Sequence, residues 1–99
     1  METDFKEMKF NTEGIPEVTS KVLDILYDQG YNWNVPHAVD QNVLSGKGTY
    51  SLYTTSEGRI LRSTDPLYYS KVVGTYIPID ITALIEEHNE KLIKKYLQN

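Results

Sequence analysis

The sequence contains no cysteine. Disulfide bonds, thiolate metal sites and a cysteine nucleophile are therefore excluded. Small secreted domains usually depend on disulfides, so their absence favours a reducing compartment. No apolar stretch approaches the ~18 residues of a membrane span, and the acidic start at residues 1–4 is unlike a signal peptide. We therefore expect a cytoplasmic protein that does not insert into membranes.

Positive charge is also scarce, because 10 Lys and Arg stand against 14 Asp and Glu, for a formal net charge of −4. Binding of duplex nucleic acid usually needs a basic face that neutralises phosphates, so this balance disfavours it. Tyrosine, by contrast, is abundant, with eight in 99 residues. Tyrosines are enriched in binding surfaces, but they are also good strand formers, so both roles stay open.

The length of 99 residues predicts a single domain over residues 1–99. Hydrophobic residues make up 39% and charged residues 24%, which is typical of a folded globular chain and not of a disordered one. Residues 1–7 are mostly polar, and we expect them to be flexible.

Apolar residues at helical spacing predict two helices. The first runs from about residue 15 to residue 29, with Pro16 in its first turn and Gly30 as a left-handed residue after its end. The second follows a capping Asp80 or Thr82 and reaches the end of the chain. The apolar side of the second helix comprises Ile81, Leu84, Ile85, His88, Leu92 and Tyr96.

Strand signals lie mainly between the two helices. Residues 49–54 and 59–63 form a predicted hairpin around the turn "TSEG", and residues 72–77 form a further strand. Pro78 places the end of that strand, or a sheet edge, at this position. With a short strand at residues 8–11, the predicted fold is α+β, with order (β)αβββα. Two helices cover a small antiparallel sheet of three to four strands.

Catalytic motifs are not evident in the sequence. The two histidines, His37 and His88, have no partner at metal-ligand spacing. The segment "SGKGT" lacks the first glycine and the final Ser or Thr of a phosphate-binding loop. No Gly-x-Ser-x-Gly nucleophile motif occurs. We therefore predict a protein that is not an enzyme, with no metal and no cofactor.

The irregular segment 31–48 is long for a small domain, and such connections are often functional. It begins with Tyr31 and Trp33, which either plug the junction of helix and sheet or, with His37, line a ligand site. Strand alternation also offers a sheet face on which a tyrosine and an arginine lie together. Such a face suits stacking on a base and contact with a phosphate. The candidate ligand-binding residues are Tyr31, Trp33, His37, Lys47, Tyr53, Arg59 and Arg62.

Four segments together, "LYDQGYNW", "YSLYTTSEGRIL", "DPLYYS" and "IPIDITALI", carry a resemblance. The chain resembles a loose group of small tailed-phage accessory proteins, in which an aliphatic helix ends in Gly-Tyr-x-Trp and a β-hairpin follows. The resemblance implies a phage-encoded, non-enzymatic protein of the host cytoplasm that counteracts a host factor, including antiviral defence. It carries over no catalytic residues, because the group defines none.

Three functional hypotheses follow. In the first, the protein binds and sequesters a nucleotide-type signal molecule of a host defence system. In the second, a tyrosine-rich, acidic surface inhibits a host protein. In the third, the protein is a small nucleotide hydrolase with His37 or Asp65 as its base. A homodimer through the final helix is compatible with each of them.

Overall fold

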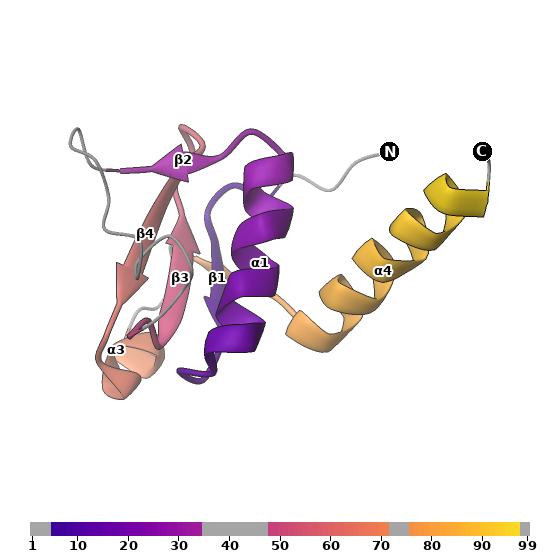
Figure 1. Ribbon diagram of the computed structural model, residues 1–99. Helices are drawn as coiled ribbons and strands as arrows, with labels where there is room; N and C mark the ends of the chain where they lie inside the picture. Colours follow the sequence, from indigo (N-terminus) through magenta and orange to yellow (C-terminus); the bar gives the residue numbers. More distant parts are fainter. Residues whose placement is uncertain (1–4, 35–47, 72–75, 98–99) are drawn as a thin grey trace.

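The computed structural model describes residues 5–34, 48–71 and 76–97. These residues form a five-stranded sheet of order β2-β4-β3-β1-β5 together with three helices (Figure 1). In chain order, the elements are β1 (Met8–Asn11), α1 (Pro16–Asp28), β2 (Asn32–Trp33), β3 (Ser51–Thr54), β4 (Arg59–Ser63), α3 (Pro66–Lys71), β5 (Ile77–Pro78) and α4 (Ile81–Leu97).

The α+β class is confirmed, but the sheet is mixed rather than antiparallel. β3 pairs antiparallel with both β1 and β4, whereas β5 pairs parallel with β1 and β2 pairs parallel with β4. Both parallel strands are two residues long and lie at the sheet edges. Pro78 therefore occupies an edge strand, as predicted. Of the strand predicted over residues 72–77, residues 72–75 lie outside the described residues.

The prediction for the first helix is confirmed at both ends. Pro16 is its first residue, and Gly30 has a φ of 87° two residues after its last residue. The backbone N–H of Gly30 donates to the carbonyl of Tyr27 at 3.0 Å, and that of Tyr31 donates to the carbonyl of Leu26 at 3.0 Å. This pair of bonds is the Schellman motif. It turns the chain so that Tyr31 enters the core, where it is buried.

The core lies between α1 and one face of the sheet. Phe10, Leu52 and Ile60 supply the sheet side, and each is 1% exposed or less. Phe5 also belongs to this core at 4% exposure, although the sequence predicts a flexible segment over residues 1–7. The helical side consists of Val22, Leu23, Ile25 and Leu26.

α4 begins at the predicted cap, because the Asp80 carboxylate accepts a hydrogen bond from the Ala83 N–H at 3.1 Å. It lies beside α1 at its beginning and then diverges from it (Figure 1). On the predicted apolar side, Leu84 is buried and Ile81, Ile85 and His88 are partly buried. Leu92 and Tyr96, farther along the helix, are exposed. No helix in the described ranges is both long enough and apolar enough to cross a membrane.

Candidate functional site

The sheet face opposite α1 carries a cluster of aromatic rings. Tyr53 on β3 lies opposite Lys9 on β1. The next pair along these strands, Phe10 and Leu52, points to the other face of the sheet and packs in the core beneath α1. The Tyr53 ring contacts Tyr68 of α3 edge-on, with centroids 5.4 Å apart, and Tyr76 at 5.3 Å. Tyr53, Tyr68, Tyr69 and Tyr76, together with Lys9, are called the tyrosine cluster below. Three parts of the chain that are distant in the sequence, β1, β3 and residues 68–76, therefore meet on this face.

The buried part of the tyrosine cluster is held by hydrogen bonds and a cation–π contact. The Tyr53 hydroxyl is 2.9 Å from the Ser51 hydroxyl, and Tyr53 is only 2% exposed. The Lys9 ammonium lies 4.4 Å from the centre of the Tyr69 ring and donates to the Tyr69 carbonyl at 3.3 Å. The rings therefore form a fixed base under the surface.

Two neighbouring residues of α3 have exposed side chains. Leu67 is 63% exposed and Tyr68 is 46% exposed. Both belong to α3, which the sequence prediction missed because it interpreted Asp65–Pro66 only as a break after the hairpin. The Asp65 carboxylate accepts a hydrogen bond from the Leu67 N–H at 2.9 Å, and Pro66 opens the helix. An acidic cap followed by proline is a helix-start signal, which could have revealed α3.

Burial raises the pKa of three tyrosines, Tyr27, Tyr53 and Tyr69. At Tyr53 the hydrogen bond with Ser51 opposes the increase in pKa, while the neighbouring tyrosines add to it. At Tyr27 the bond from Trp33 opposes the increase, and the nearby Asp24 carboxylate adds to it. All three phenols therefore stay protonated to a higher pH in the folded protein than a free tyrosine does.

This burial predicts a loss of stability in alkali. A free tyrosine titrates near pH 10. Above that pH the unfolded chain gives up phenol protons that the folded chain retains, so the free energy of unfolding falls until the folded pKa is passed. We expect phenolate absorbance to show a late-titrating group in the folded protein that disappears in denaturant. If all eight tyrosines titrate together near pH 10 in the folded protein, burial does not raise the pKa of these tyrosines and the prediction is wrong.

The residues predicted to bind a ligand do not form one surface in the described structure. Tyr31 and Tyr53 are buried, on opposite sides of the sheet. Arg59 and Arg62 are both exposed, but Arg62 pairs with Leu52 on the α1 face, and Arg59 lies on the other face. Tyr53 and Arg59 thus share a face, as strand alternation allows, whereas Arg62 does not.

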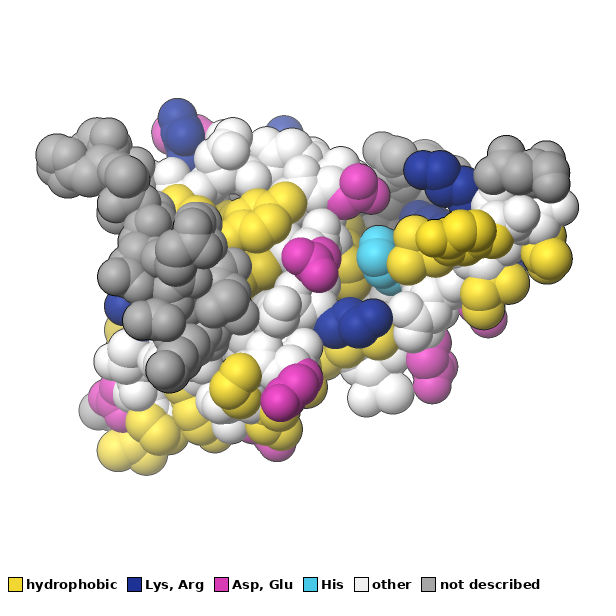
Figure 2. All heavy atoms as spheres, viewed as in Figure 1, with side chains coloured by type: hydrophobic (Ala, Val, Ile, Leu, Met, Phe, Trp, Pro, Cys, Tyr) yellow, Lys and Arg dark blue, Asp and Glu magenta, His cyan; other side chains and the backbone are white. Residues whose placement is uncertain are grey.

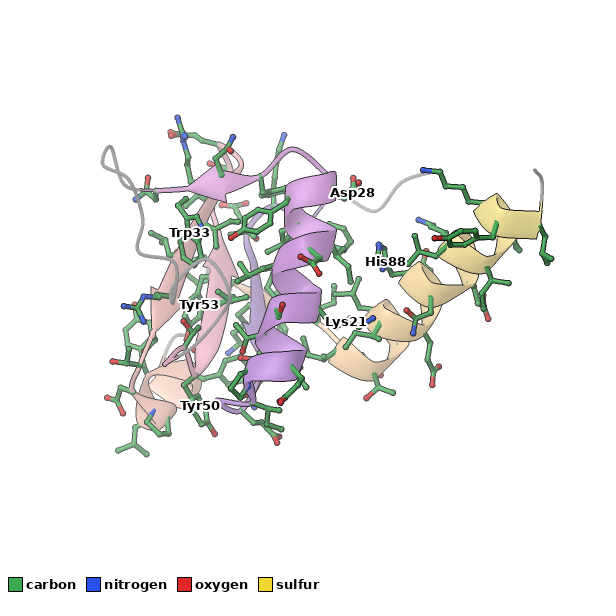
Figure 3. The ribbon with its side chains drawn as sticks, in the orientation of Figure 1. Lys21, Asp28, Trp33, Tyr50, Tyr53 and His88 are labelled. Carbon is green, nitrogen blue, oxygen red and sulfur yellow. The ribbon has the colours of Figure 1, made fainter. Side chains whose placement is uncertain are left out.

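Trp33 lies at the junction of helix and sheet. It packs against the core from β2, and its indole N–H donates to the Tyr27 hydroxyl at 2.8 Å (Figure 3). This placement supports the first of the two interpretations, in which Trp33 plugs the junction. His37 and Lys47, the remaining candidate residues, lie outside the described residues.

A cleft of about 390 Å³ separates α1 from α4. Figure 3 shows the His88 side chain between the two helices, and its Nδ1 atom is buried without a hydrogen-bond partner among the described residues. The described ranges hold no group of three or more His, Asp or Glu side chains placed to bind a metal ion. Charged side chains from both helices line the cleft: Asp24, Asp28, Glu87, Lys91 and Lys95.

Comparison of the chain with known protein families, with curated proteins and with solved structures finds no match. Inferences about function therefore rest on the surfaces of this molecule. Two of them stand out in the described residues: the exposed Leu67 and Tyr68 of α3, and the exposed hydrophobic residues in the C-terminal half of α4.

Proposed function

We propose that this is a non-enzymatic binding protein that inhibits another protein through Leu67 and Tyr68, the exposed residues of α3, together with the tyrosine cluster to which Tyr68 belongs. The observation that carries the proposal is the exposure of Leu67 and Tyr68 on α3, where the Tyr68 ring packs edge-on against the buried Tyr53. Binding energy at protein interfaces concentrates in a few aromatic anchors, and tyrosine provides contact area at a low cost in side-chain entropy. A base that is already ordered lowers that cost further.

The charge of the protein suggests the nature of the partner. A net charge of −4 favours association with a basic protein and predicts an association rate that falls with added salt. In line with the resemblance to phage accessory proteins, we propose a host protein as this partner, and a factor of antiviral defence as the favoured candidate. A nucleic-acid-binding face on that factor would supply the basic surface.

The geometry favours a protein over a nucleotide-type ligand as the partner. A nucleotide site needs a stacking ring and a phosphate-binding cation on one accessible surface. Tyr53 shares its face with Arg59 but is buried, and Trp33 lies on the other face and bonds to Tyr27. The Asp65 carboxylate, a base in the hydrolase hypothesis, accepts the hydrogen bond at the start of α3, which supports a structural role.

The test is a double variant, Leu67→Ala with Tyr68→Ala. A partner is first captured from host lysate at low salt, identified and purified, and its affinity is then measured by calorimetry. We expect the double variant to lose at least about thirtyfold in affinity, equivalent to ~2 kcal/mol. Ile15→Ala is the matched control, because Ile15 is also exposed, at 42%, and precedes α1. Unchanged affinity in the double variant contradicts the proposal.

A thermal-shift screen separates the two classes of partner. The panel contains cyclic dinucleotides, cyclic oligonucleotides and ADP-ribose derivatives. A ligand at 100 times its dissociation constant adds ~2.7 kcal/mol, which corresponds to a midpoint increase of about 10 °C in a domain of this size. We expect no such increase. A large shift with one compound, retained in the double variant, would restore the nucleotide hypothesis.

A further inference from the structure

The cleft between α1 and α4 has an apolar floor. Three hydrophobic side chains of the core line it: Phe5, Ile25 and Leu84, and each is buried. Small-molecule sites usually occupy about 300–1,000 Å³ and combine an apolar lining with a few polar groups. The cleft, at about 390 Å³, lies near the lower end of this range, so its size suits a small molecule.

The two walls of the cleft carry opposite charges. α1 contributes Asp24 and Asp28, one helical turn apart, and these two residues are called the acidic wall. α4 contributes Lys91 and Lys95, also one turn apart, which are called the basic wall. All four residues are exposed, and neither aspartate forms an ion pair within the described residues. Figure 2 shows the His88 imidazole at the surface between the two helices, with acidic side chains over α1 and basic side chains farther along α4.

Two other charged side chains lie near these walls. Glu87 lines the cleft from α4, and its carboxylate lies 3.7 Å from the Lys91 ammonium. Both side chains of this pair are more than half exposed, so the pair is weak, and Lys91 can contact a ligand at little cost. Lys21 of α1 lies nearer the beginning of α4 (Figure 3) and is not among the residues that line the cleft.

We propose that this cleft binds a small zwitterion with a hydrophobic body, which is the chemistry of a free amino acid with a large apolar side chain. The ammonium group of the ligand contacts the acidic wall, its carboxylate contacts the basic wall, and its apolar body covers the floor. A ligand with one charge would be attracted by one wall and repelled by the other. A neutral ligand would leave both walls without a partner, so a zwitterion is the best match to the charges.

This site goes beyond the proposed inhibition of a protein and uses different residues. It lies on the α1 side of the sheet, whereas the tyrosine cluster lies on the opposite face. The two proposals therefore make separate predictions, and each can fail without the other.

The first experiment measures binding of purified protein to a ligand panel by calorimetry at low salt. The zwitterions are phenylalanine, leucine and 6-aminohexanoate, which differ in body and in the spacing of their charges. Phenethylamine and 3-phenylpropionate are the matched controls, because each keeps the phenyl body of phenylalanine and lacks one of its two charges. We expect at least one zwitterion to bind with a dissociation constant below about 1 mM. Both singly charged analogues should bind at least about tenfold more weakly than phenylalanine.

The second experiment removes the charge of one wall at a time. Asp24→Asn with Asp28→Asn, and separately Lys91→Gln with Lys95→Gln, should each weaken zwitterion binding at least about tenfold. The acidic-wall variant should also lose most of its preference for phenylalanine over 3-phenylpropionate, because the ammonium then has no carboxylate to contact. Glu86→Gln with Glu90→Gln, and separately Lys94→Gln, are the matched controls, because these residues are exposed on α4 and do not line the cleft. Circular dichroism should show the same helix content in all variants.

The third experiment locates the ligand with the His88 imidazole, which lies between the two helices (Figure 3). The protein has two histidines, so its imidazole resonances form a simple NMR spectrum, and His88→Gln identifies the signal of His88. This signal should shift as phenylalanine or another zwitterion that binds is added, and the shift should saturate at the dissociation constant that calorimetry gives.

Three outcomes would overturn the proposal. They are no binding of any zwitterion below about 10 mM, a singly charged analogue that binds as tightly as phenylalanine, and variants of both walls that bind like the wild type. Leu67→Ala with Tyr68→Ala should bind the zwitterion unchanged. Failure of the cleft site and failure of the inhibitory surface are therefore distinguishable.

Discussion

Replacing Phe10 with alanine is expected to lower the free energy of unfolding by about 3–5 kcal/mol. Phe10 is fully buried in β1, a strand with neighbours on both sides, and its ring lies 6.3 Å from that of Phe5. The substitution removes the apolar area of the ring from the core and leaves a cavity that α1 cannot fill without moving. A domain of 99 residues has about 5–15 kcal/mol of stability in total, so the variant is expected to be marginal.

Urea denaturation followed by circular dichroism measures this loss. Ile77→Ala is the matched control, because Ile77 lies on β5, which pairs with β1, but is 59% exposed. Its cost should stay near 0.5 kcal/mol, the usual range for surface positions. A cost below about 1 kcal/mol for Phe10→Ala would show that the packing between α1 and the sheet is not as described.

Thr54→Val is expected to lower the free energy of unfolding by about 2–4 kcal/mol, although threonine and valine have side chains of similar shape. Thr54 is fully buried, and its hydroxyl accepts a hydrogen bond from the Met8 N–H at 3.0 Å. The same hydroxyl bonds to the carbonyl oxygen of Phe5. Valine removes both contacts, and each buried backbone group that loses its partner costs about 1–3 kcal/mol.

The neighbouring Thr55 provides the control for this prediction. Its hydroxyl accepts hydrogen bonds from the N–H groups of Glu57 and Arg59 in the exposed turn, where water can replace it. Thr55→Val should therefore cost less than about 1 kcal/mol. Thr54→Val should also increase cleavage by a protease in residues 5–8, because the bonds to Phe5 and Met8 hold that segment against β3. Equal costs for the two substitutions would contradict this role.

The sequence predicted most of the elements that depend on neighbouring residues, with α3 as the exception. Three local signals predicted their elements correctly: the helical spacing of apolar residues that ends at Gly30, the cap at Asp80, and the turn before Arg59. β2 and β5 depend instead on parallel pairing with strands far along the chain, which leaves no periodic pattern in two residues. The mixed character of the sheet was therefore not predictable from the sequence.

For the candidate sites too, the sequence predicted features that depend on neighbouring residues but not contacts between distant segments. Strand alternation correctly separated Tyr53 from Leu52, but it could not show that α3 would bring Tyr68 over Tyr53. Helical periodicity identified the apolar side of α4, but not that Leu92 and Tyr96 on this side would be exposed. Coverage depends on where the two helices diverge, and that angle is a property of the packed structure.

The position of β1 in the sheet has a consequence for folding kinetics. β1 precedes the other described strands in the chain, yet it lies between β3 and β5, which follow it by about forty and about seventy residues. Pairings at such sequence separation require large loops to close and are slow to form. The β3–β4 hairpin is local and can form first. During synthesis, β1 therefore keeps one edge unpaired until β5 has emerged, and an unpaired strand edge favours association with other chains.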